Sequence, residues 1–232
     1  MNNIVYFQDI AMATQHVIQQ WQRIANQAIV SHGIFTVAVS GGSSPVRLYQ
    51  ALAQEKNLPW SLTEIFLVDE RFVPYTNSDS NYGMIKKQLL DKLTRNYAKM
   101  HPIPMDKTPQ KSALVYANQL KKNLSLLSNS FPVFDLILLG LGADGHTASL
   151  FTQQDCEEKE KFAMYTVSPQ IPHNRITLTL PVLNHAKNII FFIRGEKKLK
   201  IMESVFKQRN LNYPASHVQL ANQQLSVVFS FN

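Results

Sequence analysis

The chain has 232 residues, of which 45% are hydrophobic and 17% charged, a composition typical of globular proteins that excludes disordered and fibrous ones. Its 23 basic residues outnumber the 16 acidic ones, which gives a net charge of +7. The lysines are scattered over predicted helices, and no zinc-finger or RNA-recognition pattern accompanies them. We therefore expect no nucleic-acid partner, whereas a small anionic substrate would suit this charge.

The length favours one domain over residues 1–232. The single cysteine, Cys156, leaves no intramolecular disulfide and no cysteine-based zinc site. No stretch approaches the roughly 18 apolar residues that cross a bilayer, and the N-terminal segment lacks the basic start of a signal peptide. We expect a cytoplasmic protein without a membrane partner, as a monomer or weak homo-oligomer.

Short apolar strands alternate with helical segments along the chain. In the first half we predict strands over 4–7, 36–40 and 65–68, and helices over 10–30, from Pro45 and from Ser80. In the second half we predict helices over 109–127 and 196–208, and strands over 134–139, 164–167, 176–180, 189–193 and 225–229. This alternation indicates an α/β fold: a Rossmann-like, mostly parallel sheet with helices on both faces.

Ligands of such sheets bind beyond the carboxyl ends of the strands, which directs attention to segments 40–45, 69–74 and 140–151. The first, Ser-Gly-Gly-Ser-Ser-Pro, joins a strand to a helix. Gly41 and Gly42 would let the backbone approach an anion, while Ser43 and Ser44 add hydroxyl donors beside the helix N-terminus. No Gly-Lys-Ser/Thr follows, so it is not a Walker A loop. The spacing alone is compatible with two interpretations, a phosphate-binding loop and a tight turn with a serine N-cap.

The third segment contains Gly-Leu-Gly-Ala-Asp-Gly, which formally matches a dinucleotide-binding loop. Its place in mid-chain and the charge that Asp144 would bring to a pyrophosphate disfavour that interpretation. The Asp-Gly-His at its end is more informative. His146 can carry protons near neutral pH, and Asp144 could orient its imidazole. The position after a buried strand favours this function over a merely structural turn.

Three cations are further candidates. Arg71, in the Asp-Glu-Arg that follows a buried strand, could bind an anion or form an ion pair at the sheet edge. Arg175 and Lys198, taken singly, are more typical of structural residues. No histidine pair has metal-ligand spacing with an acid, so we expect no metal and no cofactor.

Taken in order, these segments resemble the 6-phosphogluconolactonase family, which shares a superfamily with glucosamine-6-phosphate deaminase. The matching segments run the length of the chain: 40–45, 69–74 with Ser80-Asn81, 140–151, 175–179 and 195–198. The resemblance implies a Rossmann-like fold and hydrolysis of 6-phospho-D-glucono-1,5-lactone to 6-phosphogluconate in the pentose phosphate pathway.

The resemblance also implies a function for individual residues. His146 corresponds to the base that deprotonates the attacking water, with Asp144 as its polar partner. Arg71 would be a cation near the reacting ring, with Asp69 as a neighbour. The positions that gather around the substrate phosphate are Ser43, Ser44, Arg175 and Lys198, within the loop that holds Gly41 and Gly42.

Two other functions are alternatives to lactone hydrolysis. The deaminase family continues its Asp-Gly-His into a segment with a proton-transferring glutamate, where this chain has Phe151, and tends to have Tyr where this chain has Arg71. A non-catalytic sugar-phosphate sensor would carry a DNA-binding helix-turn-helix, for which the sequence before the first predicted strand leaves no room. Both alternatives are disfavoured.

Overall fold

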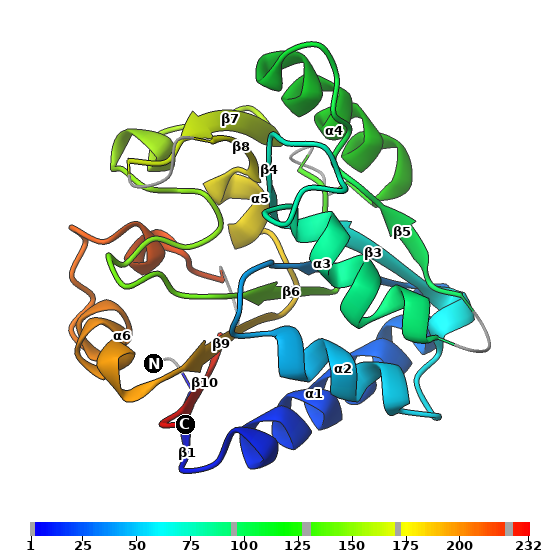
Figure 1. The fold of residues 1–232 in the computed structure, drawn as a ribbon, viewed down its shortest axis with the longest axis vertical. Helices are drawn as coiled ribbons and strands as arrows, with labels where there is room; N and C mark the ends of the chain where they lie inside the picture. The colour runs from blue at the N-terminus through cyan, green and yellow to red at the C-terminus, as the bar shows by residue number, and fades with distance from the viewer. Residues whose placement is uncertain (1–2, 94–96, 127–130, 170–172, 221–224) are drawn as a thin grey trace.

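Seven parallel strands form the central sheet of the computed structural model, which describes residues 3–93, 97–126, 131–169, 173–220 and 225–232. The strand order is β1-β10-β9-β6-β2-β3-β5 (Figure 1). The strands are β1 (Asn3–Phe7), β2 (Phe35–Val39), β3 (Thr63–Leu67), β5 (Lys99–His101), β6 (Leu136–Leu139), β9 (Ile189–Arg194) and β10 (Ser226–Ser230). A nearly continuous run of buried apolar side chains in the inner strands follows from burial on both faces.

Helices cover both faces of this sheet, as the sequence predicts. The helices are α1 (Ile10–His32), α2 (Val46–Gln54), α3 (Asn81–Gln88), α4 (Pro109–Asn123), α5 (Leu180–Asn184) and α6 (Leu199–Phe206). Trp21 of α1 meets Phe35 of β2 on one face, with ring centroids 5.5 Å apart. The strand register places Phe191 of β9 on the opposite face, where Phe206 of α6 packs against it at 4.7 Å. The parallel, two-sided α/β architecture is thereby confirmed.

A second, three-stranded antiparallel sheet was not predicted. It has the order β4-β8-β7, formed by β4 (Asp69–Arg71), β7 (Ala163–Val167) and β8 (Asn174–Leu178). Figure 1 shows it at the top of the molecule with α4, away from α1 and α2. The segment Asp69–Arg71, expected only as a polar strand end, is therefore a strand itself. Alternation of apolar runs identifies strands but does not tell which sheet they join.

Other differences concern the ends of elements. Helix α4 ends at Asn123 rather than near Leu127, which lies outside the described residues, and the helix predicted over 196–208 is a short 3₁₀ turn followed by α6. Strand β5 and the short helix α5 were missed. β5 has three residues, too few for a periodic pattern to stand out.

Asp135 immediately precedes β6 and stabilises the start of this strand. It lies at the end of the sheet opposite the carboxyl ends of the strands. Its carboxylate, nearly fully buried, accepts hydrogen bonds from the backbone N–H and hydroxyl of Thr36 and from Lys187 Nζ, all at 2.9 Å. Burial favours the neutral acid, but the hydrogen bonds from Lys187 and Thr36 outweigh this and hold the pKa of Asp135 below its ordinary value.

We expect Asp135→Asn to lower the free energy of unfolding by about 1–3 kcal/mol at pH 7, because an amide NH2 would face donors. A carboxyl with a lowered folded pKa stabilises the fold above its unfolded pKa, and that stabilisation is lost as the pH falls through the folded value. The difference between wild type and variant should therefore shrink below about pH 4. Urea unfolding of both proteins between pH 7 and pH 3 measures this, and a difference independent of pH would contradict it.

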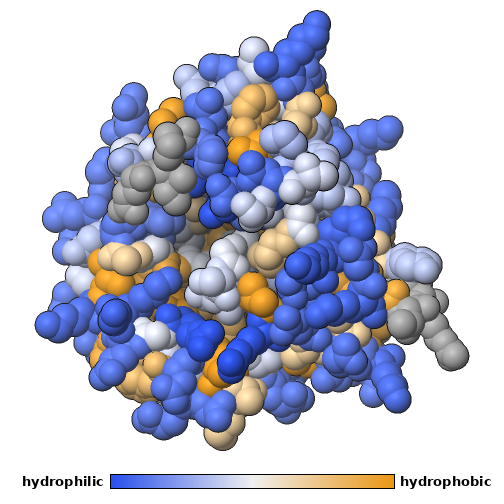
Figure 2. Space-filling model, viewed as in Figure 1, coloured by the Kyte–Doolittle hydropathy of each residue, from blue (hydrophilic) through white to orange (hydrophobic). Residues whose placement is uncertain are grey.

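No helix within the described residues is long and apolar enough to cross a membrane. The face shown in Figure 2 is mostly hydrophilic, with hydrophobic side chains in small separate groups.

Candidate active site

A cavity of about 250 Å³ lies beyond the carboxyl ends of four neighbouring strands, β9, β6, β2 and β3. The chain runs from β2 to β3 and β5 on one side, then returns to place β6 on the other side of β2. Strand order therefore reverses at β2, and open α/β sheets bind ligands at such a switch point. The three segments predicted to converge there do so.

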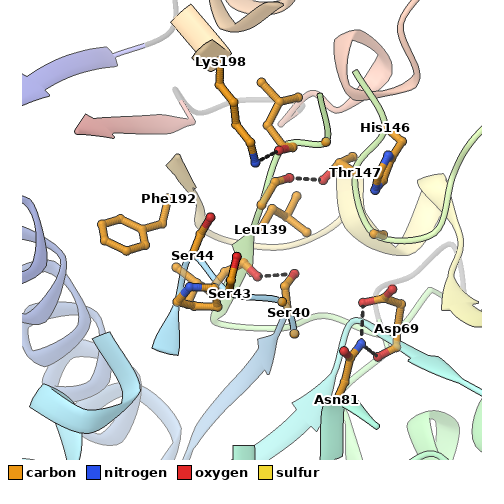
Figure 3. A pocket seen from close by; sticks show the side chains of 18 of the residues that line it. Ser40, Ser43, Ser44, Asp69, Asn81, Leu139, His146, Thr147, Phe192 and Lys198 are labelled. Atoms are coloured by element: carbon orange, nitrogen blue, oxygen red, sulfur yellow. Dashed lines mark hydrogen bonds between the residues drawn. The ribbon is translucent and has the colours of Figure 1, made fainter. Parts of the chain in front are cut away.

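The loop after β2 forms one wall of the cavity and leads into α2 (Figure 3). The Ser40 hydroxyl donates to the Leu138 carbonyl at 2.9 Å, and the Tyr49 hydroxyl donates to the Ser40 carbonyl, so the loop is tied to β6 and to its own helix. Ser43 and Ser44 line the cavity together with Gly41 and Gly42. Free backbone N–H groups at the start of a helix and nearby hydroxyls make a site for an anion.

Lys198 reaches the same cavity from the 3₁₀ turn Glu196–Lys198 that follows β9. Its Nζ donates to the Leu141 carbonyl at 2.5 Å, so the cation is held over the loop after β6. Burial lowers the pKa of Lys198, an effect that the negative charge of Asp144 partly opposes. A partly desolvated ammonium group that lines the same cavity as the loop before α2 adds a second source of positive potential for an anionic ligand.

His146 lies across the cavity from Ser43 and Ser44, in the turn after β6 (Figure 3). Its Nδ1 is hydrogen-bonded to Asp144 Oδ1, and its backbone N–H donates to the same oxygen at 3.3 Å. Burial alone would raise the pKa of Asp144, but the charge and hydrogen bonds of His146 outweigh it and hold that pKa below its ordinary value. An ionised Asp144 requires Nδ1 to carry the proton, which leaves Nε2 as the basic nitrogen.

Phe151 packs against the imidazole of His146, with ring centroids 4.9 Å apart. Its backbone N–H donates to Asp155 Oδ2 at 2.9 Å, and the Asp155 carboxylate also accepts from Thr152 and Thr166. This network holds the aromatic ring in place. The position that would hold an acid in the deaminase pattern is therefore an apolar wall beside the histidine.

Asp69 is nearly fully buried in the cavity wall, held by two residues whose part in the site the sequence analysis missed. The Ser149 hydroxyl donates to Asp69 Oδ2 at 2.7 Å, and the Asn81 amide donates to its backbone carbonyl at 2.8 Å. Asn81 is part of the sequence resemblance to the 6-phosphogluconolactonase family, but no function is predicted for it there. Nothing in the local sequence around Ser149 indicates that it meets a residue 80 positions earlier.

Gly41 allows the close approach of Asn81, because a methyl group at position 41 would overlap the Asn81 side-chain amide. We expect Gly41→Ala to displace Asn81 and lower the free energy of unfolding by about 1–3 kcal/mol. Gly140→Ala is the matched control, since a methyl group there would meet nothing within 4 Å. Thermal unfolding of both variants tests this, and equal melting temperatures would contradict it.

Arg71 and Arg175 are directly opposed on the antiparallel strands β4 and β8. Arg71 lines the cavity, and its Nη1 donates to the Asp79 carbonyl. Arg175 is 3% exposed and does not line the cavity, and its Nη1 finds no hydrogen-bond partner among the described residues. Burial, together with the charge of Arg71, lowers the pKa of Arg175. The negative charges of Asp69, Glu70 and Asp79 partly oppose this lowering, so charges of both signs lie at this wall.

The structure brings most of the predicted site residues together. Those that line the cavity are Gly41, Gly42, Ser43, Ser44, Asp69, Arg71, His146 and Lys198. Asp144, which is hydrogen-bonded to His146, and Arg175, which is paired with Arg71 across two strands, do not line the cavity. Within the described ranges, no three His, Cys, Asp or Glu side chains are grouped so as to hold a metal ion. The arrangement offers a base, several cations and an anion loop.

Comparison with known proteins shows the family to which the chain is similar. A family model described as glucosamine-6-phosphate isomerases/6-phosphogluconolactonase matches residues 8–227. The chain is 36% identical to a probable 6-phosphogluconolactonase of Schizosaccharomyces pombe, over 95% of this chain and 90% of that protein. It is 37% identical to a 6-phosphogluconolactonase of Synechocystis, over 83% of this chain and 81% of that protein.

A solved structure shares the whole architecture. The crystal structure of a 6-phosphogluconolactonase from Shewanella baltica superposes with a TM-score of 0.87 at 26% sequence identity. The match covers 99% of this chain and 98% of the other. The overall fold of this chain therefore has a counterpart in a solved protein.

Proposed function

Because the chain belongs to the glucosamine-6-phosphate isomerase/6-phosphogluconolactonase family, we propose that it hydrolyses 6-phospho-D-glucono-1,5-lactone to 6-phospho-D-gluconate, a step of the oxidative pentose phosphate pathway. One observation carries the proposal. The Asp144–His146 pair, the cations Arg71 and Lys198, and the loop before α2 all converge on one cavity. A phosphorylated lactone needs a proton acceptor at one end and an anion site at the other.

We assign the substrate phosphate to the loop of Gly41, Gly42, Ser43 and Ser44, which lines the same cavity as Lys198. Backbone N–H groups at the α2 N-terminus and the serine hydroxyls donate to the phosphate oxygens, while Lys198 supplies a full charge. Arg175, which is buried and does not line the cavity, adds positive potential. This end of the cavity fixes the substrate and so directs its ring toward His146.

His146 acts as the general base in this proposal. Asp144 holds the proton on Nδ1, so Nε2 accepts a proton from a water molecule as the water oxygen bonds to the lactone carbonyl carbon. The carbonyl oxygen becomes negatively charged, and Arg71 stabilises it. The tetrahedral intermediate then collapses: the bond from this carbon to the ring oxygen breaks, and the ring oxygen takes the proton from His146. The product is the open-chain acid, which releases a proton at neutral pH.

Asp69 positions the sugar ring of the substrate in this proposal. Its Oδ2 accepts from Ser149 and its backbone from Asn81, so the carboxylate is held at the cavity wall. A fixed carboxylate accepts hydrogen bonds from sugar hydroxyl groups. Ester hydrolysis by this route requires an activated water and charge stabilisation, both of which these side chains supply.

The family also includes isomerases, and the chemistry of residue 151 separates the two activities. Phe151 contacts the imidazole of His146 and carries no group that exchanges protons. We therefore place this chain with the lactonases and not with the glucosamine-6-phosphate deaminases. We also propose a cytoplasmic enzyme that works as a monomer or weak homo-oligomer, in keeping with its composition and its single cysteine.

The two activities are tested side by side with the purified protein. Lactone hydrolysis releases a proton, which a pH-stat records, and deamination of glucosamine 6-phosphate releases ammonia, which glutamate dehydrogenase detects. We expect proton release from the lactone well above the spontaneous rate and no ammonia from the amino sugar. Ammonia release without accelerated lactone hydrolysis would overturn the assignment.

A further inference from the structure

The segment 210–217 lies against the turn that carries His146, although the two are some 70 residues apart in the sequence. The Ala215 N–H donates to the Gly145 carbonyl at 3.0 Å. The Gln153 side chain, from the other end of the same loop, donates to the Leu211 carbonyl. The catalytic turn is therefore held from outside by a segment that does not line the cavity.

The side chain of Tyr213 packs against this turn at Gly145. Gly145 has φ +81°, and a methyl group on it would lie 2.8 Å from Cγ and 2.9 Å from Cβ of Tyr213. The tyrosine side chain therefore packs directly on the Cα of the residue between Asp144 and His146. Gly145 adopts the left-handed conformation that glycine allows. Two hydrogen bonds within the turn hold its backbone, from the Gly145 N–H to the Gly142 carbonyl at 3.1 Å and from the Gly142 N–H to the His146 carbonyl at 2.8 Å, and Tyr213 adds side-chain packing to them.

We propose that Tyr213 is a positioning residue that acts through Gly145 to hold the His146 imidazole in line with Asp144. The argument rests on the function proposed above for His146. The Asp144–His146 hydrogen bond joins residues on either side of Gly145, so rotation about that glycine changes it directly. The Tyr213 ring and the Ala215 N–H restrict this rotation from one side of the turn, and Phe151 packs on the imidazole itself.

The Tyr213 ring positions His146 by packing on Gly145. Tyr213→Phe should therefore keep the His146 imidazole in position, whereas Tyr213→Ala should not. Leu211→Ala is the matched control, because Leu211 belongs to the same segment but its side chain is half exposed. The backbone carbonyl of Leu211, which accepts from Gln153, is retained in that variant.

We expect Tyr213→Ala to lower kcat by about 10- to 100-fold with little change in KM, since small misplacement of a catalytic group costs rate and the phosphate site is untouched. Tyr213→Phe and Leu211→Ala should keep the wild-type kcat. An equal loss in Tyr213→Ala and Leu211→Ala, or a loss in Tyr213→Ala that Tyr213→Phe shares, would overturn the proposal. Should Tyr213→Ala fail to fold, Tyr213→Leu serves in its place, because it keeps bulk but not the flat ring.

A second readout does not depend on catalysis. The His146 Nδ1 proton, hydrogen-bonded to Asp144, should give a low-field proton NMR signal that disappears in His146→Ala. We expect this signal to shift or broaden in Tyr213→Ala and to stay unchanged in Tyr213→Phe and Leu211→Ala. An unchanged signal in Tyr213→Ala would overturn the positioning proposal even if the protein hydrolyses the lactone. A shifted signal in a protein without lactonase activity would leave it standing and overturn only the proposed function.

Discussion

Replacing His146 with alanine is expected to lower kcat/KM for 6-phosphogluconolactone hydrolysis by about 10²–10⁴-fold, the usual contribution of a general base. The loss should fall mainly on kcat, because the phosphate site is formed by other residues. His146 lines the cavity, whereas its partner Asp144 does not. Steady-state kinetics of the purified variant, corrected for spontaneous hydrolysis, measures this effect.

His32→Ala is the matched control for that experiment. His32 also pairs with a carboxylate, Asp135, at 3.0 Å, and its side chain is about as exposed as that of His146. It lies at the opposite end of β6 from the cavity, so its loss should leave kcat/KM unchanged. If His146→Ala retained wild-type kcat/KM, His146 would not be the base.

The second large effect is expected for Lys198→Met. Losing a charge-assisted hydrogen bond of about 1.5–3 kcal/mol to the phosphate corresponds to roughly a 10- to 100-fold rise in KM for the phosphorylated lactone. Unphosphorylated D-glucono-1,5-lactone makes no phosphate contact, so its kcat/KM should not change in this variant. The variant should therefore lose the preference for the phosphorylated substrate, which the ratio of kcat/KM for the two lactones measures.

The neighbouring Lys197→Met controls for the loss of one positive charge, since Lys197 is exposed and does not line the cavity. It should keep the substrate preference. Lys198 also donates to the Leu141 carbonyl, so its replacement could act on the loop after β6 instead. In that case Lys198→Met would impair both lactones equally, a result that contradicts phosphate binding by Lys198.

Local sequence was sufficient for the parts of the fold that depend on neighbouring residues. Pro45 at the start of α2 and Ser80 as the cap of α3 have local causes, a fixed φ and a side-chain acceptor for the Gly83 N–H. Continuous apolar runs identified β2, β3 and β6 because burial on both faces demands them. The convergence of the three loops then followed from the rule for parallel sheets.

Contacts between distant segments could not be predicted in this way. The Ser149–Asp69 hydrogen bond, the pairing of Arg71 with Arg175 and the packing of Tyr213 on Gly145 all depend on how the two sheets and the last third of the chain come together. The tight glycine at position 41 has the same cause, since its neighbour Asn81 is 40 residues away. Residue types at these positions have many structural uses, and their function emerges only from the three-dimensional arrangement.

A coupled assay of the wild-type protein tests the proposed lactone hydrolysis most directly. Glucose-6-phosphate dehydrogenase supplies the lactone, and 6-phosphogluconate dehydrogenase reports its hydrolysis through formation of NADPH. We expect 6-phosphogluconate formation well above the spontaneous rate, in proportion to the amount of protein added. A rate equal to that without the protein, from a sample shown to be folded, would contradict it.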